Sequence, residues 1–144
     1  LPPAAGLIWS YVRLAQALPE QSRVYAIQAP AIESDDALQY SFQDIVLYYA
    51  KIIQKLTNSS DYILLGWSSG AIFSYAVACY LEGLAHAPKR LILVDGYIEK
   101  DLKNHQPIEE CSTSYDEDFE KIEKELGIKS LPKDLKESIR RVLE

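Results

Sequence analysis

The segment from Tyr62 to Ala71 constrains this chain more than any other part of its sequence. It is an apolar, strand-like run that leads into a Gly-x-Ser-x-Gly pentapeptide at residues 66–70, followed by small, helix-forming residues. A strand, a sharp turn and a helix in this order are typical of a nucleophile elbow, in which a strained turn presents a serine hydroxyl. Ser68 is therefore the candidate nucleophile. The alternative interpretation is an ordinary N-cap at the start of a helix.

The order of patterns around this segment predicts an α/β protein. Strand-like runs at 24–29, 62–67 and 90–94 alternate with helical patterns at 7–18, 42–56 and 71–81. Crossovers of this length connect parallel strands, so we expect a mostly parallel sheet flanked by helices. Ser41 and Asp44 predict a capping box at the start of the second helix. The polar residues 31–40 predict a surface loop.

The composition changes after residue 98. Residues 99–144 are strongly charged and contain two amphipathic helical patterns, at 114–126 and 132–143, with no further strand pattern. They form either a solvated pair of surface helices or a helical cap over the carboxyl edge of the sheet. We divide the chain, as one domain, into a partial core at 1–98 and this region at 99–144. Because the chain starts in a proline-containing loop and no closing strands follow the charged region, we expect the domain to be incomplete at both ends.

The composition argues against several classes of function. A net charge of −6 provides no basic stripe for nucleic acid and no attraction to anionic lipid. The longest apolar stretch, 71–81, is far shorter than the ~20 residues of a membrane span. Cys79 and Cys111 are too few for a disulfide framework, which favours a reducing cytoplasm. The scattered His and Cys residues suggest no metal site, and no nucleotide-binding motif is present.

Two side chains with catalytic potential fall at the carboxyl ends of predicted strands, where open α/β sheets bind ligands. Ser68 follows one strand and Asp95 follows the next. An acyl-transferring serine needs a base, an acid that orients the base, and N–H donors for the oxyanion. Asp95 suits the acid, although an Asp-Gly pair more often caps a turn. The N–H of Ser69 would supply one donor, and the loop at 3–6 is the candidate source of a second.

Neither histidine of the chain makes a convincing base. His86 follows the helix after Ser68, where an exposed histidine at a helix C-terminus is the default. His105 follows Asp95, which fits the order Ser, Asp, His, but it comes only shortly afterwards and in a polar loop. We therefore expect the catalytic histidine beyond Glu144.

Four motifs together resemble the type I thioesterase domains of nonribosomal peptide synthetases and polyketide synthases, within the α/β-hydrolase superfamily. They occur in the family's order over residues 1–97, at 2–6, 24–30, 66–70 and 91–97. The first continues into a helix with Trp9 and Tyr11, and the third into a helix that ends at Glu82 and Gly83. Four motifs in the correct order are much more specific than the pentapeptide alone.

The resemblance implies an α/β-hydrolase fold with a helical lid from about Glu99 onward. Ser68 would take an acyl or peptidyl chain from the phosphopantetheine arm of a carrier protein, forming an acyl-enzyme. Asp95 would hold the histidine, and the N–H groups of Ala4 and Ser69 would form the oxyanion hole. Water or a nucleophile within the chain would then release an acid or a macrocycle, and no cofactor beyond the carrier's arm is implied.

Two other functions remain open on the sequence. A carboxylesterase or lipase of the same fold would use the same serine on simple esters. A non-catalytic module would keep the hydrolase shape and only dock a carrier protein.

Overall fold

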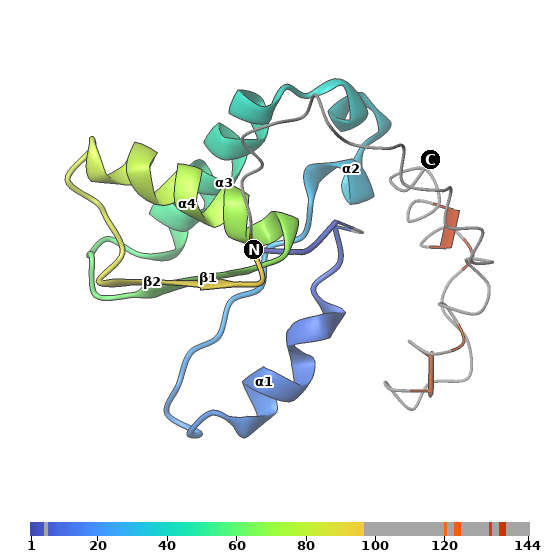
Figure 1. Cartoon of the computed structure of the whole chain (residues 1–144), viewed down its shortest axis with the longest axis horizontal. Coiled ribbons are helices and arrows are strands. Elements are labelled where there is room, and N and C mark those ends of the chain that lie inside the picture. The colour runs from blue at the N-terminus through green and yellow to red at the C-terminus, as the bar shows by residue number, and fades with distance from the viewer. Residues whose placement is uncertain (5, 97–119, 121–122, 125–132, 134–135, 138–144) are drawn as a thin grey trace.

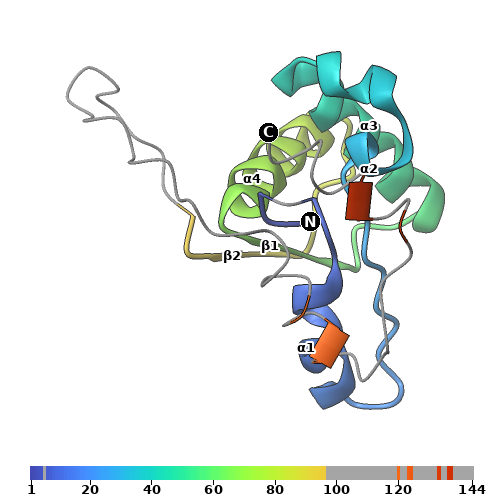
Figure 2. The ribbon, with the colours of Figure 1, turned by 90° about the vertical axis from the view of Figure 1, so that its right-hand side faces the viewer.

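The computed structural model describes residues 1–4, 6–96, 120, 123–124, 133 and 136–137. Two parallel strands form its centre, with two long helices on one face and a short helix on the other, as both views show (Figures 1 and 2). The expected lid region, 99–144, lies outside the described residues apart from the isolated positions above. His105 and Cys111 lie outside them as well.

The described elements alternate as the α/β prediction requires. Residues Trp67 and Val94 are register partners in the parallel pair, as are Leu65 and Ile92, which confirms the predicted strand direction. In chain order the elements are the 3-10 helix η1 (Trp9–Tyr11), α1 (Val12–Ala17), α2 (Pro30–Glu33), η2 (Asp35–Gln39), α3 (Phe42–Leu56), β1 (Ile63–Trp67), α4 (Ser69–Glu82) and β2 (Arg90–Val94).

Helix α3 begins with the predicted capping box. The Ser41 hydroxyl accepts a hydrogen bond from the Asp44 backbone N–H at 3.2 Å, and the Asp44 carboxylate accepts one from the Ser41 N–H at 2.9 Å. The helix ends where Thr57 turns to an extended conformation, with φ −145° and ψ 139°. Local chemistry therefore determines where this helix begins.

The prediction of a strand at 24–29 is wrong. These residues pair with neither β1 nor β2, and the Val24 and Tyr25 side chains are 48% and 59% exposed. The N–H of Ala29 instead donates to the carbonyl of Gly6 in the first loop, at 3.0 Å. A strand requires a neighbouring strand for its hydrogen bonds, and an apolar run alone does not provide one.

The prediction of a loop at 31–40 is also wrong, because the short helices α2 and η2 occupy this stretch. Pro30 is the first residue of α2, a position where the fixed φ of proline favours a helix and its missing N–H costs nothing. Ser34, in an extended conformation, separates the two helices. The segment therefore packs as short turns, with Ile32 and Ala37 buried.

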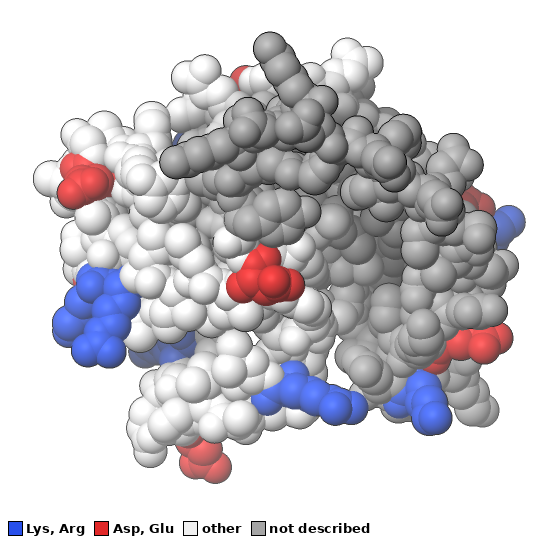
Figure 3. Space-filling view, viewed as in Figure 1, with Lys and Arg blue, Asp and Glu red and all other residues white. Residues whose placement is uncertain are grey.

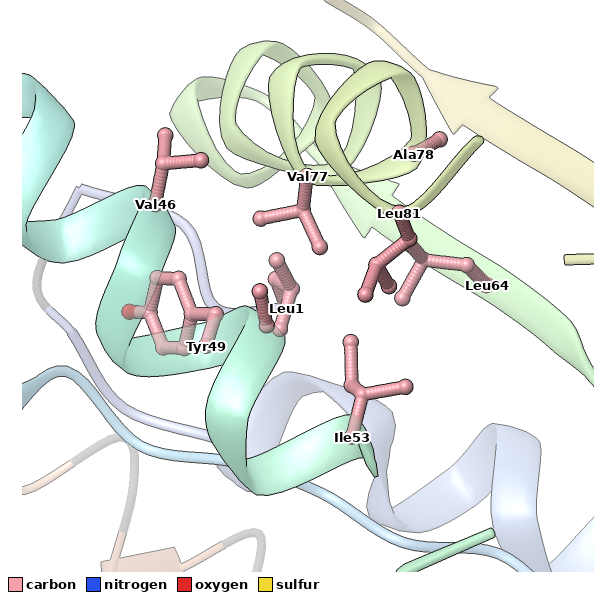
Figure 4. Close-up of a cluster of buried hydrophobic side chains, with 9 residues drawn as sticks. Leu1, Val46, Tyr49, Ile53, Leu64, Val77, Ala78 and Leu81 are labelled. Carbon is pink, nitrogen blue, oxygen red and sulfur yellow. The ribbon is translucent and has the colours of Figure 1, made fainter. Parts of the chain in front are cut away.

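The hydrophobic core lies where α3, α4 and β1 meet (Figure 4). Tyr49 of α3 and Val77 and Leu81 of α4 are at most 1% exposed. Leu1 inserts its side chain among them, and its backbone nitrogen donates a hydrogen bond to the carbonyl of Leu65 in β1. The start of the first loop is therefore anchored beside the strand that leads to the pentapeptide.

Charged side chains are spread over the face of the molecule that Figure 3 shows. On the face in Figure 3, Lys and Arg side chains are scattered among uncharged atoms, and those described form no large cluster. None of the helices in the described ranges combines the length and apolar character needed to cross a bilayer.

Candidate active site

Ser68 occupies a strained turn between β1 and α4. Its φ of 55° and ψ of −126° lie in a region of backbone conformation that residues other than glycine rarely adopt. Ser68 stands at the N-cap position of α4, but its hydroxyl makes no capping hydrogen bond to that helix. The geometry therefore differs from that of an ordinary N-cap, in which the side chain satisfies the first N–H groups of the helix.

The two glycines of the pentapeptide allow this turn to pack closely. A Cβ atom at Gly66 would overlap the carbonyl oxygen of Gly70 and the hydroxyl of Ser74. A Cβ atom at Gly70 would overlap the carbonyl oxygens of Leu1 and Pro2. The absence of a side chain at Gly66 therefore lets α4 pack closely on β1, and its absence at Gly70 lets the start of the first loop lie on the first turn of α4.

Asp95 leaves the sheet beside Ser68. The Ser68 N–H donates to the carbonyl of Val94 at 2.9 Å, which continues the pairing of Trp67 with Val94 by one bond. Asp95 is exposed, has a φ of 52°, and its carboxylate makes no hydrogen bond to a described residue. The next residue, Gly96, lies so close to α4 that a Cβ atom on it would overlap the side chain of Ala71. The structure thus brings the two predicted side chains to one edge.

The two candidate oxyanion donors come from segments that touch. Leu1 and Pro2, at the start of the loop at 1–6, lie on the first turn of α4, and the Gly6 N–H, with Gly6 at φ 72°, donates a 2.8 Å hydrogen bond to the carbonyl of Pro3. Ala4 is exposed on this loop. Ser69 is the first residue of α4, so its N–H has no acceptor within the helix. Their role as donors stays a prediction.

Tyr11 connects the loop to the elbow, a role that its place in the sequence did not predict. Its hydroxyl accepts a 2.9 Å hydrogen bond from the Trp67 N–H and donates one to the carbonyl of Leu1. Burial raises the pKa of the Tyr11 hydroxyl, and the hydrogen bond from the Trp67 backbone lowers it in part. No local pattern could reveal a contact between residues 56 positions apart.

The sequence predicted that His86 is an exposed histidine at a helix end, and this prediction is wrong. The His86 ring packs against Tyr62 with 5.7 Å between centroids, and its Nε2 is buried without a partner among the described residues. The Tyr62 hydroxyl donates to the backbone carbonyl of His86 at 2.8 Å. Tyr62 precedes β1 and Ser68 follows it, so about 17 Å of strand separates the two ends. His86 therefore lies beyond hydrogen-bond reach of Ser68.

The described residues contain no group of three or more His, Cys, Asp or Glu side chains that could hold a metal ion. What they bring together is a strained serine after one parallel strand, an aspartate after its neighbour, and a loop laid over the first turn of the intervening helix. This arrangement defines an α/β protein with an elbow-like turn. The chain belongs to the thioesterase domain family, whose model, described as "Thioesterase domain", matches residues 1–139. Membership implies the α/β-hydrolase fold and hydrolase activity.

Relatives of this chain are peptide and polyketide synthases. A dimodular nonribosomal peptide synthase of Bacillus subtilis is 30% identical over 95 residues, which are 66% of this chain and 4% of the relative. A non-reducing polyketide synthase of Cladonia grayi has the same identity and coverage. Malpibaldin synthetase of Mortierella alpina is 28% identical over 105 residues, 73% of this chain and 2% of the relative. The chain thus spans a few per cent of the length of these relatives, and the resemblance seen in the sequence is confirmed.

Proposed function

We propose that this chain belongs to a thioesterase that releases an acyl or peptidyl chain from the phosphopantetheine arm of a carrier protein, through an acyl-enzyme on Ser68. The observation that carries the proposal is the backbone of Ser68, with φ 55° and a hydroxyl not used for capping. Strain of this kind costs free energy and persists where the surrounding structure enforces it, often at functional sites. Family membership supports the same reaction class.

In the proposed reaction, the Ser68 hydroxyl oxygen attacks the thioester carbonyl carbon while a histidine takes the hydroxyl proton. The C–S bond then breaks, and the histidine returns the proton to the departing sulfur. Water or a nucleophile within the bound chain next attacks the Ser68 ester, giving an acid or a macrocycle. Asp95 would hold this histidine, a role that His86 cannot fill from the opposite edge of the sheet.

The proposed oxyanion hole consists of the N–H groups of Ala4 and Ser69. The position of Ser69 at the start of α4 supports this role, because the helix leaves that N–H unpaired and its dipole favours negative charge. The loop that carries Ala4 lies on the same turn, through the contact of Pro2 with Gly70. Removal of one oxyanion donor typically slows a reaction by about 10²- to 10³-fold.

The proposed partner is an acyl or peptidyl carrier domain, which presents the substrate on its own phosphopantetheine arm. No cofactor of the thioesterase itself, no nucleic acid and no membrane enter the proposal, and we place the reaction in the cytoplasm. The synthase and synthetase names of the relatives support a carrier-bound substrate.

The test compares Ser68→Ala with Ser22→Ala in the protein that contains this chain. Ser22 is exposed, and its hydroxyl makes no hydrogen bond to a described residue, so it is a matched control. A fluorophosphonate probe and a carrier-bound acyl thioester are the reagents. We expect Ser68→Ala to lose both labelling and turnover, and Ser22→Ala to keep both. Labelling of Ser68→Ala at the wild-type level would contradict the nucleophile assignment.

The same reagents separate the two alternatives. A carboxylesterase or lipase would turn over a simple ester of the same acyl group as well as the carrier-bound thioester. A docking module would bind the carrier equally well with Ser68→Ala and would show no turnover in the wild type. We expect the thioester to be preferred.

A further inference from the structure

A phenol hydroxyl interrupts the hydrogen-bond ladder beside the elbow. The backbone nitrogen of Leu1 donates to the carbonyl of Leu65. In a regular parallel ladder, the next bond would run from the N–H of Trp67 to the carbonyl of Leu1. Instead, the hydroxyl of Tyr11 lies between them, accepting from the Trp67 N–H at 2.9 Å and donating to the Leu1 carbonyl.

The inserted hydroxyl increases the distance between the first loop and β1 at Trp67. Two hydrogen bonds in series span more distance than one, so the first loop separates from β1 at Trp67, immediately before Ser68. The carbonyl of Leu1, which the hydroxyl holds, also lies against Gly70 in the first turn of α4. Tyr11 thus fixes the loop at 1–6 relative to both sides of the strained turn.

We propose that Tyr11 is a positioning residue. It sets the separation between the loop at 1–6 and the Ser68 elbow, and therefore the alignment of the two oxyanion donors. This inference rests on the proposed function. The Tyr11 hydroxyl uses its proton on Leu1 and accepts from Trp67, so it acts through the backbone and not on substrate. Ala4 and Ser69 lie on the two segments that it joins.

The protonation state of Tyr11 predicts how the effect of its substitution depends on pH. Burial holds the pKa of its hydroxyl above the ordinary value of 10.0, so the group stays a proton donor throughout the neutral range. The effect of removing it is therefore independent of pH between about pH 6 and pH 9.

The experiment uses Tyr11→Phe in the protein that contains this chain, with a carrier-bound acyl thioester. Poor alignment of the oxyanion donors reduces the stabilisation of the transition state more than it reduces the binding of the substrate. We expect kcat to fall by about 10- to 100-fold with KM within about twofold. Saturating fluorophosphonate should still label Ser68 fully, which reports a folded elbow. Tyr80→Phe is the matched control, because that exposed hydroxyl has no hydrogen-bond partner among the described residues.

A wild-type kcat in Tyr11→Phe, or a change confined to KM, would overturn the inference while Ser68→Ala remains inactive. Turnover by Ser68→Ala would instead refute the proposed function, and the inference with it. Should Tyr11→Phe not fold, hydrogen exchange of the Trp67 amide in the wild type provides the second test. Protection of that amide supports the bridge, and exchange at the rate of a free amide overturns it.

Discussion

Gly66 and Gly83 both adjoin α4, yet they differ in the space available for a side chain. A Cβ atom at Gly66 would overlap the backbone of Gly70 and the hydroxyl of Ser74, the only buried polar side chain in the described core. A Cβ atom at Gly83 would meet only the carbonyl oxygen of Tyr80, at 3.4 Å, and the φ of −60° there suits any residue. The first glycine is needed for close packing and the second is not.

We therefore predict that Gly66→Ala destabilises the protein by about 3 kcal/mol, because backbone atoms cannot move aside as a flexible side chain can. Gly83→Ala should change the free energy of unfolding by at most about 1 kcal/mol, in the stabilising direction, since it lowers the entropy of the unfolded chain. Urea unfolding of the two variants and the wild type measures both values. Equal effects of the two substitutions would contradict this account of the elbow.

The stability of helix α3 depends on its capping box. The two hydrogen bonds from Ser41, from its hydroxyl first and its backbone N–H second, hold the pKa of the Asp44 carboxyl below its ordinary value of 3.8. A folded-state pKa below the unfolded value means that the box stabilises the fold above the unfolded pKa. This stabilisation is lost as the pH falls through the folded pKa.

Ser41→Ala should thus lower the stability at neutral pH by about 1 kcal/mol, the usual cost of a lost N-cap. The difference from the wild type should shrink as the pH falls from the ordinary value of 3.8 through the lower pKa of Asp44 in the folded state, because its carboxylate becomes protonated there. Ser22→Ala, outside any helix, is the control. Thermal unfolding across the acid range measures the effect, and a difference that does not depend on pH would argue against the carboxylate's part in the cap.

The success of sequence-based prediction also varied by element, for a physical reason. The bounds of α3 follow from an apolar stripe and a cap, both of which are local, and the structure confirms them. The run at 24–29 looks equally apolar, but a strand depends on a neighbour that local sequence does not specify. Pro30, the residue that follows this run, begins α2. Local signals therefore predicted the long helix α3 better than the strand partners or the short helices at 30–39.

The two edges of the sheet carry different kinds of residues. The carboxyl edge holds Ser68 and Asp95, whose proximity followed from the rule that parallel strands end at the same edge. The bridge by Tyr11 at this edge could not be predicted, because it joins distant segments through one hydroxyl. The amino edge holds an exposed ion pair between Asp61 and Lys89, at 2.7 Å, which contributes little to stability.

His86 lies at the amino edge, and its place there leads to a prediction about the catalytic base. A base must come within about 3 Å of the nucleophile's proton, whereas the length of β1, about 17 Å, separates Ser68 from the edge where His86 packs on Tyr62. We predict that His86→Asn keeps kcat for thioester turnover within about twofold of the wild type, because the substitution removes only the stacking contact.

The matched control for this variant is Tyr62→Phe, which removes the hydrogen bond to the His86 backbone without touching the imidazole. Both variants should lower the melting temperature slightly and leave the pH profile of kcat unchanged. A general base usually contributes a factor of at least about 10² to the rate. If His86→Asn alone lowered the activity by 100-fold or more, His86 would have to reach the carboxyl edge in another conformation. An unchanged kcat places the base among residues outside the described ranges, where a scan of histidine variants in the same assay would find it.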